Sequence, residues 1–99
     1  SAHGETAMSG AQPGDTPATT AYREAMARMH EDMAVDYTND ADVDFMRGMI
    51  PHHQGAIDMA RIVLEHGTDP EVRALAEEVI ATQQAEIDMM EAWLAEHDG

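Results

Sequence analysis

Methionine and histidine side chains recur at three- and four-residue spacing in two stretches of this chain. That spacing places side chains on one face of a helix. The ten candidate ligands are Met26, Met29, His30, Met33, Met46, Met49, His52, His53, Met59 and Met90. Thioether sulfur is a soft, neutral ligand that suits Cu(I) and Ag(I), whereas imidazole suits copper, zinc, iron and nickel. The mixed set therefore predicts a copper-binding protein, with Cu(I) favoured over Cu(II) and with Ag(I) as a further soft ion.

The chain contains nine Met and six His but no Cys. A thioether ligand needs no deprotonation, and its metal affinity does not depend on keeping a thiol reduced. Such ligands suit an oxidising exterior, although the absence of Cys fits either an oxidising or a reducing compartment. The sequence lacks the basic start and apolar stretch of a signal peptide, as expected of an exported protein after its signal has been removed.

Packing is the alternative explanation for these side chains. Methionine is a flexible core filler, so Met26, Met29, Met33 and Met90, taken singly, are readily explained as packing residues. A single buried His53 would need only a hydrogen-bond partner. The pair His52-His53 is harder to explain in this way, because each buried polar group needs its own partner. We therefore expect the pair to bind metal.

Two glutamines of the last helix are candidates to support the histidine pair. Gln83 and Gln84 lie on or beside the apolar face of that helix. Their side chains could hydrogen-bond to the rings of His52 and His53 and so orient them toward a metal ion.

Three helices must position these side chains. Thr16-Pro17 is a capping residue followed by a proline suited to the first turn, so we expect a first helix from there to about Asp36. Thr68 and Asp69 precede Pro70 and form a strong start signal for a third helix that keeps its apolar pattern to Leu94.

The second helix carries the histidine pair. The run TNDAD (38–42) favours a turn, and Asp42 or Asp44 could cap a helix that begins near Phe45 and ends at Gly67 in a left-handed conformation. Pro51 removes an amide donor inside this helix, so we expect a kink just before the pair.

These elements predict an all-α protein with three antiparallel helices per chain. Residues 1–15 are small and polar and are expected to form a flexible tail, with residues 16–99 as the single domain. The long second and third helices would leave apolar surface uncovered in a monomer, so self-association into a homo-oligomer is expected to complete the bundle.

Composition argues against several classes of function. The net charge of −15 repels phosphate backbones, so nucleic acid is not an expected partner. No apolar run reaches the roughly 18 residues that span a bilayer, so no membrane insertion is expected. The Glu-x-x-His pairs of di-iron bundles, zinc-protease motifs, phosphate loops and nucleophile elbows are all absent, so we do not expect an enzyme.

Two segments resemble a known protein family. The segments are DFMRGMIPHHQGAIDMA (44–60) and DPEVRALAEEVIATQQAEIDMMEAWL (69–94). They resemble the bacterial domain-of-unknown-function family three-hundred-and-five, which comprises exported, ferritin-like helical proteins and includes CopM-type periplasmic copper-binding proteins. The resemblance implies a ferritin-like bundle and extracytoplasmic copper binding in copper tolerance, sequestration or delivery. It therefore implies a periplasmic or secreted protein with a copper-transfer protein as a partner. It implies Met49, His52, His53 and Met59 as ligands, with Met29, His30 and Met33 as a second group.

Two other functions remain open from the sequence. A Met-rich helical face could bind a partner protein with no role for metal, because methionine surfaces adapt to many partners. A Met/His haem site is also conceivable in a bundle, although the Cys-x-x-Cys-His marker is absent.

Overall fold

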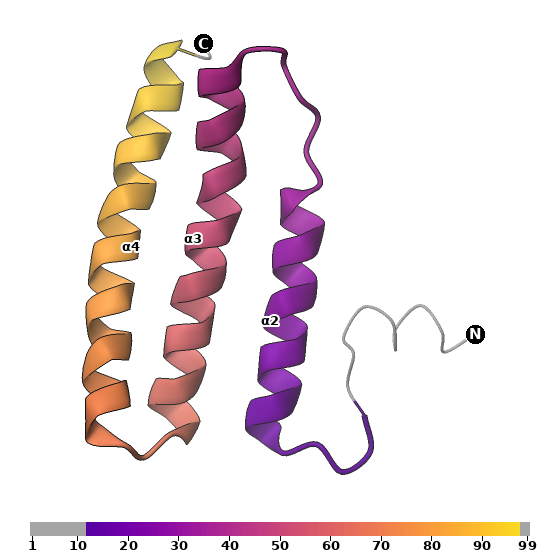
Figure 1. Cartoon of the computed structure of the whole chain (residues 1–99), viewed down its shortest axis with the longest axis vertical. Coiled ribbons are helices and arrows are strands. Elements are labelled where there is room, and N and C mark those ends of the chain that lie inside the picture. Colours follow the sequence, from indigo (N-terminus) through magenta and orange to yellow (C-terminus); the bar gives the residue numbers. More distant parts are fainter. Residues whose placement is uncertain (1–11, 98–99) are drawn as a thin grey trace.

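The computed structural model describes residues 12–97, which form three helices (Figure 1). They are α2 (Pro17–Met33), α3 (Ala41–His66) and α4 (Pro70–His97). Each helix runs antiparallel to the one before it, and α3 lies between the other two. No strand occurs between residues 12 and 97. The predicted all-α fold with three helices is therefore confirmed.

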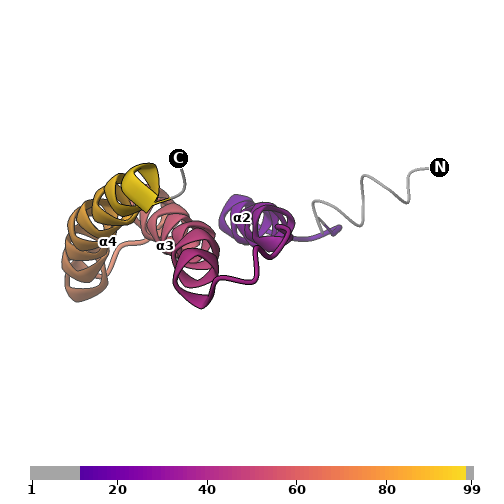
Figure 2. The same ribbon diagram turned by 90° about the horizontal axis from the view of Figure 1, so that it is seen from above.

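The three helices form a single layer. Contacts join α2 to α3 and α3 to α4, and within residues 12–97 none joins α2 to α4. The shortest dimension of the molecule is 15 Å, little more than the 10–12 Å diameter of one helix. The view along the helices shows the same open arrangement (Figure 2). The bundle is therefore open. Helix α3 has α2 on one side and α4 on the other, and within residues 12–97 no second layer covers either face of the three helices.

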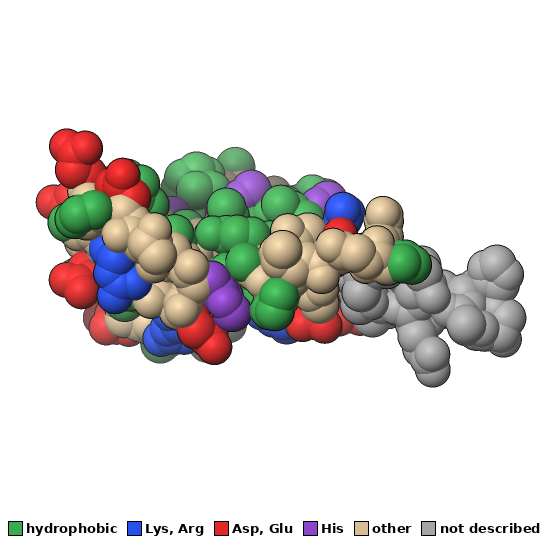
Figure 3. All heavy atoms as spheres, turned by 90° about the horizontal axis from the view of Figure 1, so that it is seen from below, with side chains coloured by type: hydrophobic (Ala, Val, Ile, Leu, Met, Phe, Trp, Pro, Cys, Tyr) green, Lys and Arg blue, Asp and Glu red, His purple; other side chains and the backbone are tan. Residues whose placement is uncertain are grey.

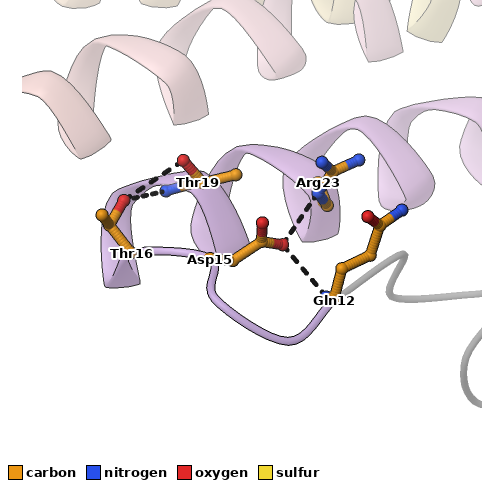
Figure 4. Close-up of polar contacts among 5 residues, drawn as sticks. All are labelled: Gln12, Asp15, Thr16, Thr19 and Arg23. Atoms are coloured by element: carbon orange, nitrogen blue, oxygen red, sulfur yellow. Dashed lines mark hydrogen bonds and ion pairs between the residues drawn. The ribbon is translucent and has the colours of Figure 1, made fainter.

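The start of α2 follows the sequence-based prediction. The Thr16 hydroxyl oxygen accepts a hydrogen bond from the Thr19 amide at 3.2 Å, as a capping residue does (Figure 4). Residues 1–11 of the expected flexible tail lie outside the described residues. At the end of that segment, the Asp15 carboxylate accepts a hydrogen bond from Arg23 Nε at 3.0 Å. The helix ends at Met33 rather than near Asp36.

The start of α3 was predicted incorrectly. The helix begins at Ala41, and its cap is Asp40, whose side chain accepts from the amide of Asp42 at 3.0 Å. Asp44 does not cap the helix, because its carboxylate accepts a hydrogen bond from the Thr38 amide at 2.9 Å. Asp40, Asp42 and Asp44 could each cap a helix from this segment, and Asp40, the first of the three, is the residue that does so.

The turn between α3 and α4 also differs from the prediction. Gly67 was expected in the left-handed conformation, but its backbone is extended (φ −86°, ψ 163°). The Arg73 guanidinium donates from one nitrogen to the carbonyls of Leu64, at 2.7 Å, and Gly67, at 3.1 Å. A side chain of the next helix thus satisfies carbonyls that a glycine cap would otherwise satisfy. Asp69 begins α4 as expected.

The core lies along the seam between α3 and α4. Ile57, Ile87 and Met90 form its buried centre, and Ile57 is completely inaccessible to solvent. Met46, Met49, Ile50 and Ile80 pack around this centre. Pro51 lies inside α3, and the helix continues past it to His66. Between residues 12 and 97 no helix is both long and apolar enough to cross a bilayer.

Candidate metal centre

His52 and His53 follow Pro51 in the middle of α3 and have different surroundings. Consecutive helical residues are about 100° apart around the axis, so two adjacent side chains cannot share one direction. His53 lies on the side of α3 that faces α4, where it meets Glu86. His52 lines a pocket that also contains Met33 of α2. The two imidazoles therefore belong to different sites.

His53 is held at both ring nitrogens. Its Nδ1 lies 3.0 Å from the Met49 carbonyl oxygen, and its Nε2 lies 2.5 Å from a Glu86 carboxylate oxygen. Both ring nitrogens therefore face oxygen atoms of the chain, and neither is open to a metal ion in this arrangement. Gln83 and Gln84 were expected to support this ring, but Glu86 does so instead.

The Glu86 contact could have been found from the sequence by extending the stripe on the last helix. Glu86 lies one turn after Gln83, so the same side of α4 carries both side chains. Its charge made it resemble a solvated surface residue, and 53% of its side chain is indeed exposed, against 12% for His53. The contact therefore forms at the edge of the α3–α4 seam.

His52, Met33 and Met49 come together around one pocket. This pocket has a volume of about 230 Å³ and lies between the end of α2 and the first half of α3. Its remaining lining residues are Val35, Tyr37, Asp44, Phe45 and Gly48. His52 is exposed, and no hydrogen bond holds its ring within residues 12–97. Two thioethers and one uncommitted imidazole are therefore available at this place.

Three further methionines line a neighbouring pocket between α2 and α3. Met26, Met29 and Met59 surround this space of about 240 Å³ together with Tyr22, Ala25 and Gly55. Met26 and Met59 are exposed, at 45% and 48%, whereas Met29 is less exposed than either of them. This group offers sulfur ligands but no imidazole.

Gly55 allows Met29 to approach the backbone of α3. A Cβ atom built on Gly55 would lie 2.6 Å from Met29 Sδ and 3.2 Å from its Cγ. Real Cβ atoms do not come that close to sulfur, so the glycine makes room for this thioether. Met29 is thus fixed by packing against α3.

The remaining predicted ligands are not brought to either pocket. Met90 is buried in the α3–α4 core, and Met46 packs against that core. His30 is exposed on α2 and lines neither pocket. The structure therefore divides the ten candidates into two methionine-lined pockets, a histidine paired with a carboxylate, two core methionines and one surface histidine.

The electrostatics of the first pocket are set by Asp44 at its edge. The Thr38 amide and hydroxyl both donate hydrogen bonds to this carboxylate, and these bonds lower the pKa of Asp44 below its ordinary value of 3.8. Asp44 is therefore a permanent negative charge near neutral pH. Within residues 12–97, no three His, Asp or Glu side chains are grouped as ligands for a hard metal ion.

Comparison with known proteins places the second half of the chain in a family. The chain is 40% identical over 55 residues to the uncharacterized protein L153 of Acanthamoeba polyphaga mimivirus, and this match covers 56% of the chain. The chain spans only 36% of the length of that relative. Residues 42–99, more than half of the chain, match the family described as Domain of unknown function (DUF305), and this region contains α4 and nearly all of α3. The chain therefore belongs to the DUF305 family.

Proposed function

We propose that this protein binds copper as Cu(I) through Met33, Met49 and His52. The observation that carries the proposal is the meeting of these three side chains, from two helices, around one pocket. Two thioethers and one neutral imidazole form a soft donor set that matches Cu(I), and Ag(I) by the same argument. The donor chemistry of the residues present therefore fits the ion.

The proposal assigns the imidazole ligand to His52 and gives His53 a different role. His52 is exposed and uncommitted, whereas both nitrogens of His53 face acceptors. Binding metal at His53 Nε2 would require Glu86 to move away. His53 instead joins α3 to α4 through its contact with Glu86.

The surroundings of the pocket suit reversible binding. Met33 is 36% exposed, and Phe45 at the pocket edge is 62% exposed, so an incoming protein could reach the ion. Exposed thioethers favour transfer by exchange of one ligand at a time. We therefore propose that the protein sequesters copper or hands it to a transfer partner, rather than holding it for catalysis.

The location of this activity is also a proposal. The proposed ligands include no thiol, so the site would keep its affinity in an oxidising periplasm or outside the cell. Cell fractionation of a host that expresses the natural gene would test this. Recovery of the protein only from the cytosol would contradict it.

The decisive experiment is an anaerobic titration with Cu(I) against a chromophoric competitor, run beside Cu(II) and Zn(II). Three variants remove one proposed ligand each: Met33→Leu, Met49→Leu and His52→Ala. Leucine preserves most of the volume of methionine, so these changes test the sulfur rather than the packing. Met89→Leu is the matched control, because Met89 is 56% exposed and lines neither methionine pocket.

The wild-type chain should compete for Cu(I), and each ligand variant should weaken binding by about tenfold or more, which corresponds to about 1.4 kcal/mol. Met89→Leu should bind as the wild type does. A second equivalent of Cu(I) lost with Met26→Leu would add the neighbouring pocket as a second site. Failure of the wild type to compete, or equal losses in Met89→Leu, would refute the proposal.

The competing proposal is a Met-rich module that binds a protein partner without metal. The half-exposed methionines Met26 and Met59 favour it, because uncovered apolar side chains on a folded domain mark interaction surfaces. Partner binding that persists in the presence of a Cu(I) chelator would support this function over copper transfer.

A further inference from the structure

One face of the helical layer carries an apolar groove that crosses all three helices. The groove has a volume of about 310 Å³, and its floor is formed by Ala56 and Ala60 of α3. Larger side chains form its walls, with Tyr22 on the α2 side and Val72 and Leu75 on the α4 side. None of its lining residues is charged, although the chain as a whole carries a net charge of −15.

The groove continues into the methionine pocket that contains Met26, because the two spaces share Tyr22 and Met59. No charged residue lines either of them. We call this combined surface the apolar face. Viewed from one end of the layer, hydrophobic side chains gather along the upper side, and most acidic side chains lie at the left end and along the lower side (Figure 3).

The apolar face is large enough for a protein interface. Its large apolar side chains Met26, Met59, Val72 and Leu75 are between 45% and 58% exposed. With about 150–200 Å² for each of them when fully exposed, they leave roughly 350 Å² of apolar surface uncovered. A stable interface buries about 800 Å² on each partner, roughly 450 Å² of it apolar, so these residues, with the half-buried Val63 and Val79 beside them, approach the apolar area that such an interface needs.

We infer that a second copy of this chain covers the apolar face, with the two layers packed face to face around a two-fold axis. A domain is normally built from at least two layers that enclose one core, whereas residues 12–97 form a single layer. A second copy is present whenever the first is, so it can supply the missing layer constantly. The small side chains of Ala56 and Ala60 would let α3 of one copy approach α3 of the other.

The distribution of charge favours this occupant over an unrelated partner. A protein attracted by the field of an acidic chain would dock where the carboxylates are, but the groove contains none. Two copies repel each other at long range, and this uncharged face is where they can meet with the least repulsion. Association should therefore strengthen when salt rises from about 0.05 M to about 0.5 M, because screening weakens the repulsion.

The test is sedimentation velocity of the full chain over a range of concentrations, with two matched variants. Leu75→Glu places a charge at the groove, where Leu75 is 58% exposed. Met89→Glu places the same charge on the same helix, outside the groove and at a similar exposure of 56%. Circular dichroism would verify that both variants remain helical.

The wild type should sediment with twice the mass of one chain, and Leu75→Glu should raise the dissociation constant by about 100-fold or more, because it buries an unpaired charge. Met89→Glu should leave the dissociation constant within about threefold of the wild type. A single cysteine at Ala56 should form a disulfide between copies more readily than one at exposed Ala74. A wild-type monomer at all concentrations, or equal effects of the two glutamates, would overturn the inference. These outcomes need no copper, so they are independent of the titration above.

Discussion

Two glycines of α3 give a sharp test of how α2 packs on α3. A methyl group added at Gly55 would lie 2.6 Å from Met29 Sδ, whereas one added at Gly48 would meet no atom within 4 Å. Both positions are interior to the helix, where alanine is favoured over glycine by about 0.5–1 kcal/mol. Gly48→Ala should therefore raise the free energy of unfolding by about that amount.

Gly55→Ala adds the same helical preference but forces Met29 to move. Overpacking of this kind costs about 1–3 kcal/mol, so the variant should be less stable than the wild type by about 1 kcal/mol. In a Met29→Ala background the obstacle is gone, and Gly55→Ala should become stabilising by about 0.5–1 kcal/mol.

Urea unfolding followed by far-UV circular dichroism, at one fixed protein concentration, measures the free energy of unfolding of all five proteins: the wild type, the three single variants and the Met29→Ala/Gly55→Ala double variant. The comparison between Gly48→Ala and Gly55→Ala controls for helical preference, and the Met29→Ala background isolates the contact. If Gly55→Ala stabilised the chain as much as Gly48→Ala does, the close approach of Met29 to the α3 backbone would be refuted.

Three further predictions concern single polar groups. Arg73→Met should lower the free energy of unfolding by about 1–3 kcal/mol in urea titrations, because the last carbonyls of α3 lose a charged donor. Glu86→Ala should cost only about 0.2–1 kcal/mol, since Glu86 is 53% exposed and its bond to His53 is screened by solvent; Glu91→Ala is the control, and equal losses would argue against the bond. Hydrogen bonds lower the pKa of Asp44 in the folded chain, so its stabilising effect is present above about pH 4 and is lost as pH falls through the folded value. Asp44→Asn should therefore lose less stability than the wild type between about pH 5 and pH 2 in acid titrations; identical acid profiles would contradict this.

Much of the fold follows from local patterns in the sequence. The three helices, their order and the starts at Thr16 and Asp69 were predicted because each depends on residues within one or two turns. The end of α3 at Gly67 was predicted correctly, but the left-handed conformation of this glycine was not, since the donor that satisfies the last carbonyls is Arg73, which belongs to the following helix. A glycine after an apolar run therefore predicts a left-handed cap only where no other side chain donates hydrogen bonds to the last carbonyls of the helix.

The candidate site was predictable as a set of residues but not as a grouping. Helical periodicity places Met49 and His52 on one face of α3, but it does not say which side of that helix meets α2. Met33 lies beside Met49 and His52 because of how α2 packs on α3. His53 contacts Glu86 because of how α3 packs on α4. The spacing rule also selected Met90 as a candidate ligand, although the structure places it in the buried core. A buried packing residue and a ligand can have the same periodicity, so spacing alone does not distinguish them.

The position of α2 at one edge of the layer has a consequence for hydrogen exchange. Within residues 12–97, α2 contacts α3 alone, so it can detach while the α3–α4 hairpin and its core remain intact. Amide protons of α2 should then exchange through a partial opening whose free energy is well below that of global unfolding. The family match begins at residue 42, after α2, in keeping with a hairpin that forms a unit of its own. Because Met33 lies on α2 while Met49 and His52 lie on α3, each such opening would separate the proposed donors. The rate at which α2 detaches from α3 would then set the rate at which a bound ion is released.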